Sequence, residues 1–336
     1  MARKKRRLRK EIIALPILFA AGFFAVPFCR SGIQAAEDYS RNSGYVDYTK
    51  NHGGLVVQMQ QRLIDRTLGD PDGKYIHYSI DDVWNCLNDL IQKESVYSSI
   101  FDNPYFARLK EIHDQTGAVF TLNTFNRSVT DQSYNISNLP SKFAHEIQNN
   151  SSWLRFAFHG KDINSDYLKE DVNEDYKTFL DAMQKFTGGS TCIDRFTRLN
   201  YFQASLDSIK GLKTASVPIE GLLTSDDDRW NYYINYEEAA VIPENGKFID
   251  TKHGLVFLKS APRLDHCTAE ELIKTLSTDS SFSNFSEVFF HEVSGIEQLD
   301  KIAQIAAWAD SQGYVNAYPS DIFKNQSELL KILPMN

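Results

Sequence analysis

The chain has 336 residues, a formal net charge of −8 and 42% hydrophobic residues. This apolar content is enough for the core of one large α/β domain, which commonly has about 200–250 residues. Beyond its N-terminus the chain is acidic and has no basic stripe. We therefore expect no nucleic-acid partner, because affinity for nucleic acid depends on cationic contacts to phosphate.

The N-terminus is basic and then apolar. The first ten residues contain seven basic side chains, and residues 12–28 follow without a charge. This order is typical of an export signal or a signal-anchor. The apolar run is short for a spanning helix, which needs about 20 residues, so cleavage and anchoring both stay open. We interpret residues 1–36 as a signal peptide or signal-anchor helix of an extracytoplasmic protein, membrane-anchored or secreted, that contacts the membrane through this segment only.

The rest of the chain is predicted to form a spacer and a catalytic domain. Residues 37–73 are polar and turn-rich except for 54–68, where apolar residues recur at helical spacing. From residue 74 onward, strands alternate with helices, which is typical of parallel strands joined by crossovers. We expect strands at 74–80, 118–125, 153–158, 191–199, 221–224, 247–251, 255–258, 287–290 and 313–318. We expect helices at 83–92, 103–117, 141–149, 174–186, 202–210, 268–277, 296–309 and after the last strand. We interpret residues 74–336 as one catalytic domain.

Reactive side chains stand where several of these strands stop. Asp81 and Asp82 end the first strand, and two like charges there need a metal, a cation or a shared proton as a partner. His159 ends the strand at 153–158, and His291 ends the strand at 287–290. Because active sites of α/β barrels and open sheets form at the carboxyl ends of strands, we expect one shared cleft there.

The order and types of these residues resemble the NodB-like polysaccharide deacetylases, a carbohydrate esterase group with a distorted (β/α)7 barrel. The segments that carry the resemblance are Ser79-Ile80-Asp81-Asp82, His159, Arg198-Leu199-Asn200-Tyr201, Asp226-Asp227-Asp228-Arg229-Trp230 and Phe289-Phe290-His291. They are similar, in the same order, to the family motifs T-F-D-D, H-[ST]-x-x-H, R-x-P-Y, D-x-x-D-W and L-x-H. The resemblance covers about residues 74–318 and implies the fold of that family.

The resemblance also implies a metal centre and a base. Asp82 and His159 would bind a divalent metal, for which we expect zinc. Asp81 would be the base that activates the attacking water, and Arg198 would hold its carboxylate in place. A metal lowers the pKa of water and polarises an acyl carbonyl, so the pair of carboxylates would divide ligation and proton transfer between them.

A second group of residues would act on the leaving group and the substrate. The resemblance implies that the backbone N–H near Tyr201 stabilises the oxyanion. His291 would protonate the leaving amine or alkoxide, and Asp226 or Asp227 would tune that histidine. Trp230 would line the substrate groove.

Three positions depart from the family pattern. The residue four after His159 is Ile163, so the second histidine ligand is missing at its expected place. Asp162, Asp166 or His266 could replace it, and we take Asp162 as the candidate. Asn200 stands where the family has proline, and Arg229 replaces the second aspartate of the fourth motif.

The predicted function is a metal-dependent hydrolase that removes acetyl groups from an N- or O-acetylated polysaccharide of the cell envelope or extracellular space. The missing histidine leaves open a catalytically inactive glycan-binding or scaffold protein on the same barrel. A metal-independent glycosidase using Asp81 and Asp227 is a third class. Structural roles are open too: Asp81 or Asp82 could cap the following helix, residues 226–228 could form a solvated turn, and residues 262–267 we interpret as structural.

Overall fold

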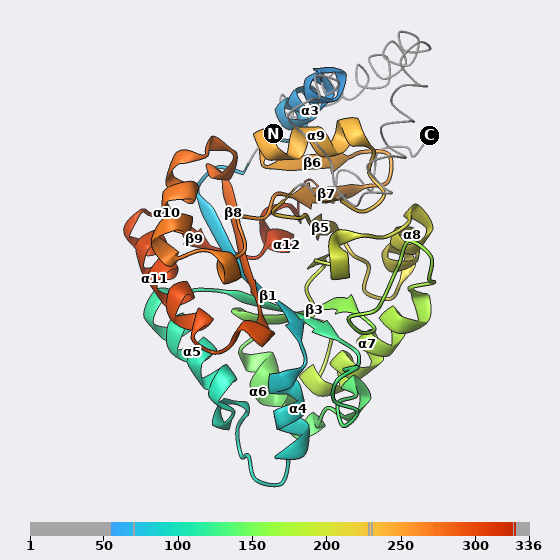
Figure 1. Cartoon of the computed structure of the whole chain (residues 1–336), viewed down its shortest axis with the longest axis vertical. Coiled ribbons are helices and arrows are strands. Elements are labelled where there is room, and N and C mark those ends of the chain that lie inside the picture. Colours follow the sequence, from blue (N-terminus) through green and yellow to red (C-terminus); the bar gives the residue numbers. More distant parts are fainter. Residues whose placement is uncertain (1–54, 70, 228, 230, 325, 327–336) are drawn as a thin grey trace, which may run out of the picture.

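The structure, a computed structural model, describes residues 55–69, 71–227, 229, 231–324 and 326 (Figure 1). The predicted signal or anchor, residues 1–36, and Trp230 lie outside the described residues. None of the helices in the described part of the chain combines the length and the apolar content that crossing a membrane requires.

Two sheets form the centre of the fold. The first has the strand order β3-β2-β1-β8, with β9 also paired to β1, and the second has the order β4-β5-β7-β6. All ladders are parallel except the β6–β7 hairpin. The strands are β1 (Tyr75–Val83), β2 (Phe120–Phe125), β3 (Leu154–Gly160), β4 (Phe196–Thr197), β5 (Gly221–Leu223), β6 (Lys247–Asp250), β7 (Leu255–Leu258), β8 (Phe285–His291) and β9 (Val315–Asn316). The predicted α/β class with parallel strands is confirmed.

The two sheets meet at two seams. A single bridge between Phe156 and Ile193 joins β3 to the segment before β4, and another between Ser260 and Glu287 joins the segment after β7 to β8. Continuous ladder pairing therefore does not close the strands into the expected barrel within the described residues. The strands at 191–199 and 313–318 are much shorter than predicted, since β4 and β9 each have two residues.

The helices lie around the strands. Figure 1 shows α5, α10 and α11 on one side of the strands and α7 and α8 on the other. The helices are α3 (Leu55–Leu68), α4 (Asn85–Gln92), α5 (Pro104–Thr116), α6 (Ala144–Asn149), α7 (Asn173–Thr187), α8 (Leu206–Thr214), α9 (Tyr236–Asn245), α10 (Ala269–Thr278), α11 (Gln298–Ser311) and α12 (Pro319–Ile322). The sequence did not predict α9, which contains Pro243 near its end.

Local signals place some helices well and one poorly. Asn103 caps α5 by accepting hydrogen bonds from two backbone N–H groups, and Gly117 ends it with φ of +72°; both residues were predicted boundaries. The predicted helix at 202–210 instead begins at Leu206. Tyr201 and Phe202 both have φ of +58°, which a helix does not allow, and Ser205 provides the cap.

The helix α3 packs on the second sheet. The Gln61 side-chain amide donates to the carbonyl of Ile249 and accepts from its N–H, both at 2.9 Å, so it pairs with the edge strand β6 as a neighbouring strand would. Ile64 is buried in a smaller apolar core that also contains Ile249, and Figure 1 shows α3 beside α9 and β6. The helix in the predicted spacer is therefore part of the folded unit.

Candidate active site

The strand β1 is irregular where the two adjacent carboxylates lie. Its register against β2 shifts between Ile80 and Val83, and Asp82 has φ of +56°. Neighbouring side chains of a regular strand point to opposite faces, whereas a bulge re-aims a side chain. A left-handed non-glycine residue costs about 1–3 kcal/mol. The strand thus runs through both aspartates rather than ending before them. The bulge allows both carboxylates to lie at the same end of the sheet.

Asp81 is held by a buried arginine. Its carboxylate accepts from Arg198 Nη1 at 2.9 and 3.2 Å and from Asn123 Nδ2 at 2.7 Å. Asp81 and Arg198 are each 1% exposed. Burial alone lowers the pKa of Arg198, but the charges of Asp81 and Glu287 raise it above its usual value. A buried charge persists only when it is paired and hydrogen-bonded, so this contact fixes the carboxylate of Asp81 in place.

Asp82, the residue after Asp81, contacts His159. Asp82 Oδ1 lies 3.1 Å from His159 Nε2, and His159 Nδ1 hydrogen-bonds the backbone carbonyl of Arg198. Arg198 therefore contacts Asp81 through its side chain and His159 through its backbone. Burial raises the pKa of the Asp82 carboxyl, but the hydrogen bond and charge of His159 and the charge of His291 bring it below its usual value.

His291 is the last residue of β8 and is the register partner of Asp81 in β1. Its Nδ1 lies 2.6 Å from Asp265 Oδ2, and its backbone N–H donates to Asp265 Oδ1 at 3.2 Å. Burial alone lowers the pKa of His291. The Asp265 hydrogen bond and the charges of Asp81, Asp82 and Asp265 outweigh burial and raise the pKa above its usual value. The imidazole therefore keeps its proton more readily than a free histidine does.

The partner of His291 corrects the expectation from sequence that Asp226 or Asp227 tunes this histidine. Asp226 accepts from the backbone N–H of Arg263 at 2.9 Å and from its guanidinium. Asp227 pairs with the Arg229 Nε at 2.9 Å and with Arg263. The two arginines satisfy Asp226 and Asp227, and the segment after β7 supplies Asp265 instead.

Asp162, the predicted replacement ligand, is also occupied. Its carboxylate accepts from Arg127 Nε at 2.7 Å and from the backbone N–H of Asn164 at 2.9 Å. The residue is buried in a turn that its own backbone makes with Ser165. This local pairing explains why Asp162 does not join Asp82 and His159.

Tyr201 lies in a tight turn after β4. Its side chain is 52% exposed, and the amide of Asn200 ties the turn to the chain after His159 by donating to the carbonyl of Ile163 at 2.9 Å. The oxyanion role of its backbone N–H stays a prediction. The groove role of Trp230 falls outside the described residues.

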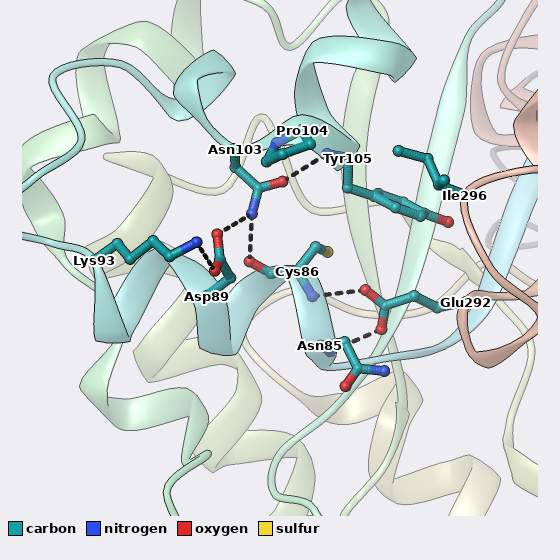
Figure 2. Close-up of a pocket in the computed structure, with 9 residues that line it drawn as sticks. All are labelled: Asn85, Cys86, Asp89, Lys93, Asn103, Pro104, Tyr105, Glu292 and Ile296. Carbon is teal, nitrogen blue, oxygen red and sulfur yellow. Dashed lines mark hydrogen bonds and ion pairs between the residues drawn. The ribbon is translucent and has the colours of Figure 1, made fainter.

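The start of α4 excludes the capping role considered for Asp81 and Asp82. The Glu292 carboxylate accepts from the backbone N–H groups of Trp84, Asn85 and Cys86 at 2.7–2.8 Å. Figure 2 shows this carboxylate facing the first turn of α4, beside a cavity of about 300 Å³. Since Glu292 meets the exposed N–H groups that a cap would satisfy, neither aspartate is needed for that role.

Asp82 and His159 are the side chains that could hold a divalent cation. Zinc binds carboxylate oxygen and imidazole nitrogen at about 2.0–2.2 Å, so two ligands of one ion lie roughly 3 Å apart, as Asp82 Oδ1 and His159 Nε2 do at 3.1 Å. The Nδ1 contact of His159 with a carbonyl orients the ring as at known metal centres. Across the described ranges, however, no group of three His, Cys, Asp or Glu side chains is placed to hold an ion. The donors fit a cation, with one protein ligand fewer than a catalytic zinc usually has.

Comparisons with known proteins give structural similarity only. No family model matches the chain, and no curated protein matches it. The chain is similar to a family 4 acetyl xylan esterase from Clostridium thermocellum in complex with a cobalt ion, at 13% identity and a TM-score of 0.43, over 78% of this chain and 94% of that one.

Two further solved structures are similar to it. One is the catalytic domain of a peptidoglycan N-acetylglucosamine deacetylase from Eubacterium rectale, at 15% identity and a TM-score of 0.41, over 75% of this chain and 91% of that one. The other is a CE4 family pseudoenzyme from Bacillus anthracis, at 9% identity and a TM-score of 0.40, over 75% of this chain and 66% of that one. These structures come from the polysaccharide deacetylase family that the motifs resemble.

Sequence reasoning missed Asp265, which lies in the segment 262–267 that we interpreted as structural. No spacing rule marks it, because its link to His291 spans 26 residues. It also missed the buried residues below Asp81. For these a signal existed: His77, Ser79 and Asp81 place polar side chains at every second position of a strand whose other residues are mostly apolar.

Proposed function

We propose that this protein is a hydrolase that removes acetyl groups from an N- or O-acetylated polysaccharide. The observation that carries the proposal is the arrangement at one end of the first sheet. A carboxylate anchored by arginine (Asp81) lies in register with a histidine that has a raised pKa (His291), next to the Asp82–His159 pair. A base, an acid and a cation-binding pair are the parts that acyl hydrolysis needs.

The side chains divide the work. Asp81 accepts a proton from the attacking water, because a carboxylate has more lone pairs than Arg198 and Asn123 use. His291 keeps a proton through Asp265 and donates it to the leaving nitrogen or oxygen. Asp82 and His159 would hold the divalent cation, zinc by its donor types. A bound cation supplies Lewis acidity that polarises the acyl carbonyl.

The short donor set implies weak binding of that cation. Two protein ligands leave the other coordination positions to solvent and substrate, so we expect zinc to exchange readily and to be lost on dialysis. Because one protein ligand of the cation is missing, the alternative function is a glycan-binding protein without activity.

The substrate and the location are parts of the proposal. A basic and then apolar N-terminus supports export with tethering or release, and an exported hydrolase of this type would meet acetylated glycans of the cell envelope or extracellular space.

The test is acetate release by the full-length protein from N-acetylated chitooligosaccharides and from O-acetylated xylan, with and without added zinc. We expect turnover that requires the metal and falls by at least a hundredfold in Asp81→Asn. Glycan binding by the wild type without any acetate release would support the inactive alternative and refute the hydrolase.

A further inference from the structure

A buried polar column continues below the site into the first sheet. His77, Ser79 and Asp81 alternate along β1 and therefore face the same side. Glu287 on β8 is the register partner of His77. His77 is 1% exposed, and Ser79 and Glu287 are fully buried. Ionisable groups are rarely buried this deeply without a partner, so each contact in the column can be accounted for.

Glu287 binds Arg198 through Nη2, the terminal nitrogen that does not contact Asp81. Its Oε1 accepts from Ser79 Oγ at 2.5 Å and from Arg198 Nη2 at 3.3 Å. Ser260 Oγ also accepts from Nη2, at 2.9 Å. Arg198 thus donates through Nη1 to Asp81 and through Nη2 to Glu287. Ser79 Oγ also accepts from Nη1 at 2.8 Å, so this contact and the two on Nη2 together set the direction in which Nη1 points.

His77 balances the charge of Glu287. The ring lies 2.6 Å from Glu287 Oε2 through Nδ1 and 2.9 Å from Thr121 Oγ1 through Nε2. The Thr121 hydroxyl donates its one proton to Asp194 at 2.8 Å, so it must accept from Nε2–H. One further proton lies between Nδ1 and Oε2. Whichever atom carries that proton, His77 and Glu287 together have no net charge.

This balance matters for Asp81. A lone carboxylate at Glu287 would compete with Asp81 for one buried guanidinium, and Coulomb attraction is strong where water is excluded. With His77 beside it, Glu287 anchors Arg198 but leaves the positive charge of the arginine to Asp81.

We propose that Glu287 and His77 are positioning residues: Glu287 orients Arg198 toward Asp81, and His77 cancels the charge with which Glu287 would otherwise draw Arg198 away. This inference rests on the proposed function, because it assigns the pair to holding the base of that reaction.

The experiment compares full-length His77→Gln, the double variant His77→Gln/Glu287→Gln and the control Glu220→Gln. Glu220 is also a buried glutamate paired with an arginine, Arg195, at 2.8 Å, and it lies outside the column. We measure kcat and KM for acetate release and solve crystal structures of the variants. We expect His77→Gln to lower kcat at least tenfold with KM within threefold, the second substitution to restore kcat to within about threefold of wild type, and Glu220→Gln to stay within twofold.

The crystal structures give an outcome that does not depend on activity. In His77→Gln we expect Arg198 Nη1 out of hydrogen-bonding range of Asp81 and Nη2 closer to Glu287, and in the double variant a return to the wild-type contacts. If the wild type releases no acetate, the proposed function fails and these contacts alone decide the inference. Recovery of folding by the second substitution, where His77→Gln alone is insoluble, also supports it. An unchanged kcat and an unmoved Arg198 in His77→Gln, or a double variant worse than the single, would overturn it, as would failure of both to fold.

Discussion

The Asp265→Asn substitution tests how His291 keeps its proton. The asparagine preserves the shape of the side chain and can still accept from the backbone N–H of His291, but it removes the charge that faces Nδ1 at 2.6 Å. Hydrogen bonds to charged groups contribute about 1.5–3 kcal/mol. Both side chains are mostly buried, at 22% and 10% exposed, so solvent screens this contact little. At about 1.4 kcal/mol for each factor of ten, the loss corresponds to roughly a 10- to 150-fold fall in the rate that depends on protonated His291.

The direction of the pKa shift of His291 determines how the pH profile of Asp265→Asn should differ from that of the wild type. The charges and hydrogen bond of the site raise the pKa of His291 against the opposing effect of burial. Removing the Asp265 charge therefore lowers this pKa, and the alkaline limb of kcat/KM moves to lower pH. We expect the loss to grow as the pH rises through the neutral range, because a histidine with a lowered pKa gives up its proton at lower pH, and to be smallest at acidic pH, where the histidine is protonated.

The assay is the pH profile of acetate release, with Asp226→Asn as the matched control. Asp226 is the residue that sequence alone assigned to His291, and its carboxylate binds Arg263 instead. Profiles that superimpose for wild type and Asp265→Asn, or an alkaline limb displaced by Asp226→Asn, would refute this reasoning.

Three further substitutions have defined outcomes. Arg198→Met leaves the buried Asp81 carboxylate without its cation and should lower the free energy of unfolding by about 3–5 kcal/mol in urea titrations, whereas Lys177→Met, at the exposed pair with Asp181, should cost under about 1 kcal/mol; equal losses would contradict the buried network. Gln61→Ala removes both contacts of α3 with the β6 backbone and should cost about 1–3 kcal/mol; no change in thermal unfolding would mean that α3 is not part of the folded unit. Ile163→His should tighten zinc binding by about tenfold or more in calorimetric titrations, since a 39% exposed side chain can change without disturbing the core; an unchanged Kd would show that this position does not face the cation.

Local features of the fold were predictable from the sequence. Asn103 and Gly117 mark the ends of α5 because capping and left-handed ends depend on single residues. The hairpin of β6 and β7 follows from two apolar runs around a turn. By contrast, α8 begins four residues later than predicted, because two consecutive residues with left-handed backbone conformation precede it. Neither is a residue type, such as glycine or asparagine, that predicts this conformation.

The site was predictable only in part. The resemblance identified Asp82 and His159, which the structure brings within 3.1 Å, and Asp81 and Arg198, which it pairs. It misplaced the partner of His291, since Asp226 and Asp227 pair with the neighbouring Arg229 and with Arg263 from a distant segment instead. The link between Asp265 and His291, and that between His77 and Glu287, depend on loop paths and strand register that the order of residues along the chain does not reveal.

The most direct measurement is an anomalous diffraction map of crystals soaked with zinc. We predict a peak bonded to both Asp82 Oδ1 and His159 Nε2, at about 2.0–2.2 Å from each, beside an Asp81 that stays bound to Arg198. A map without density there, with the direct contact between Asp82 and His159 intact at saturating zinc, would contradict the claim that this end of the sheet holds a catalytic cation.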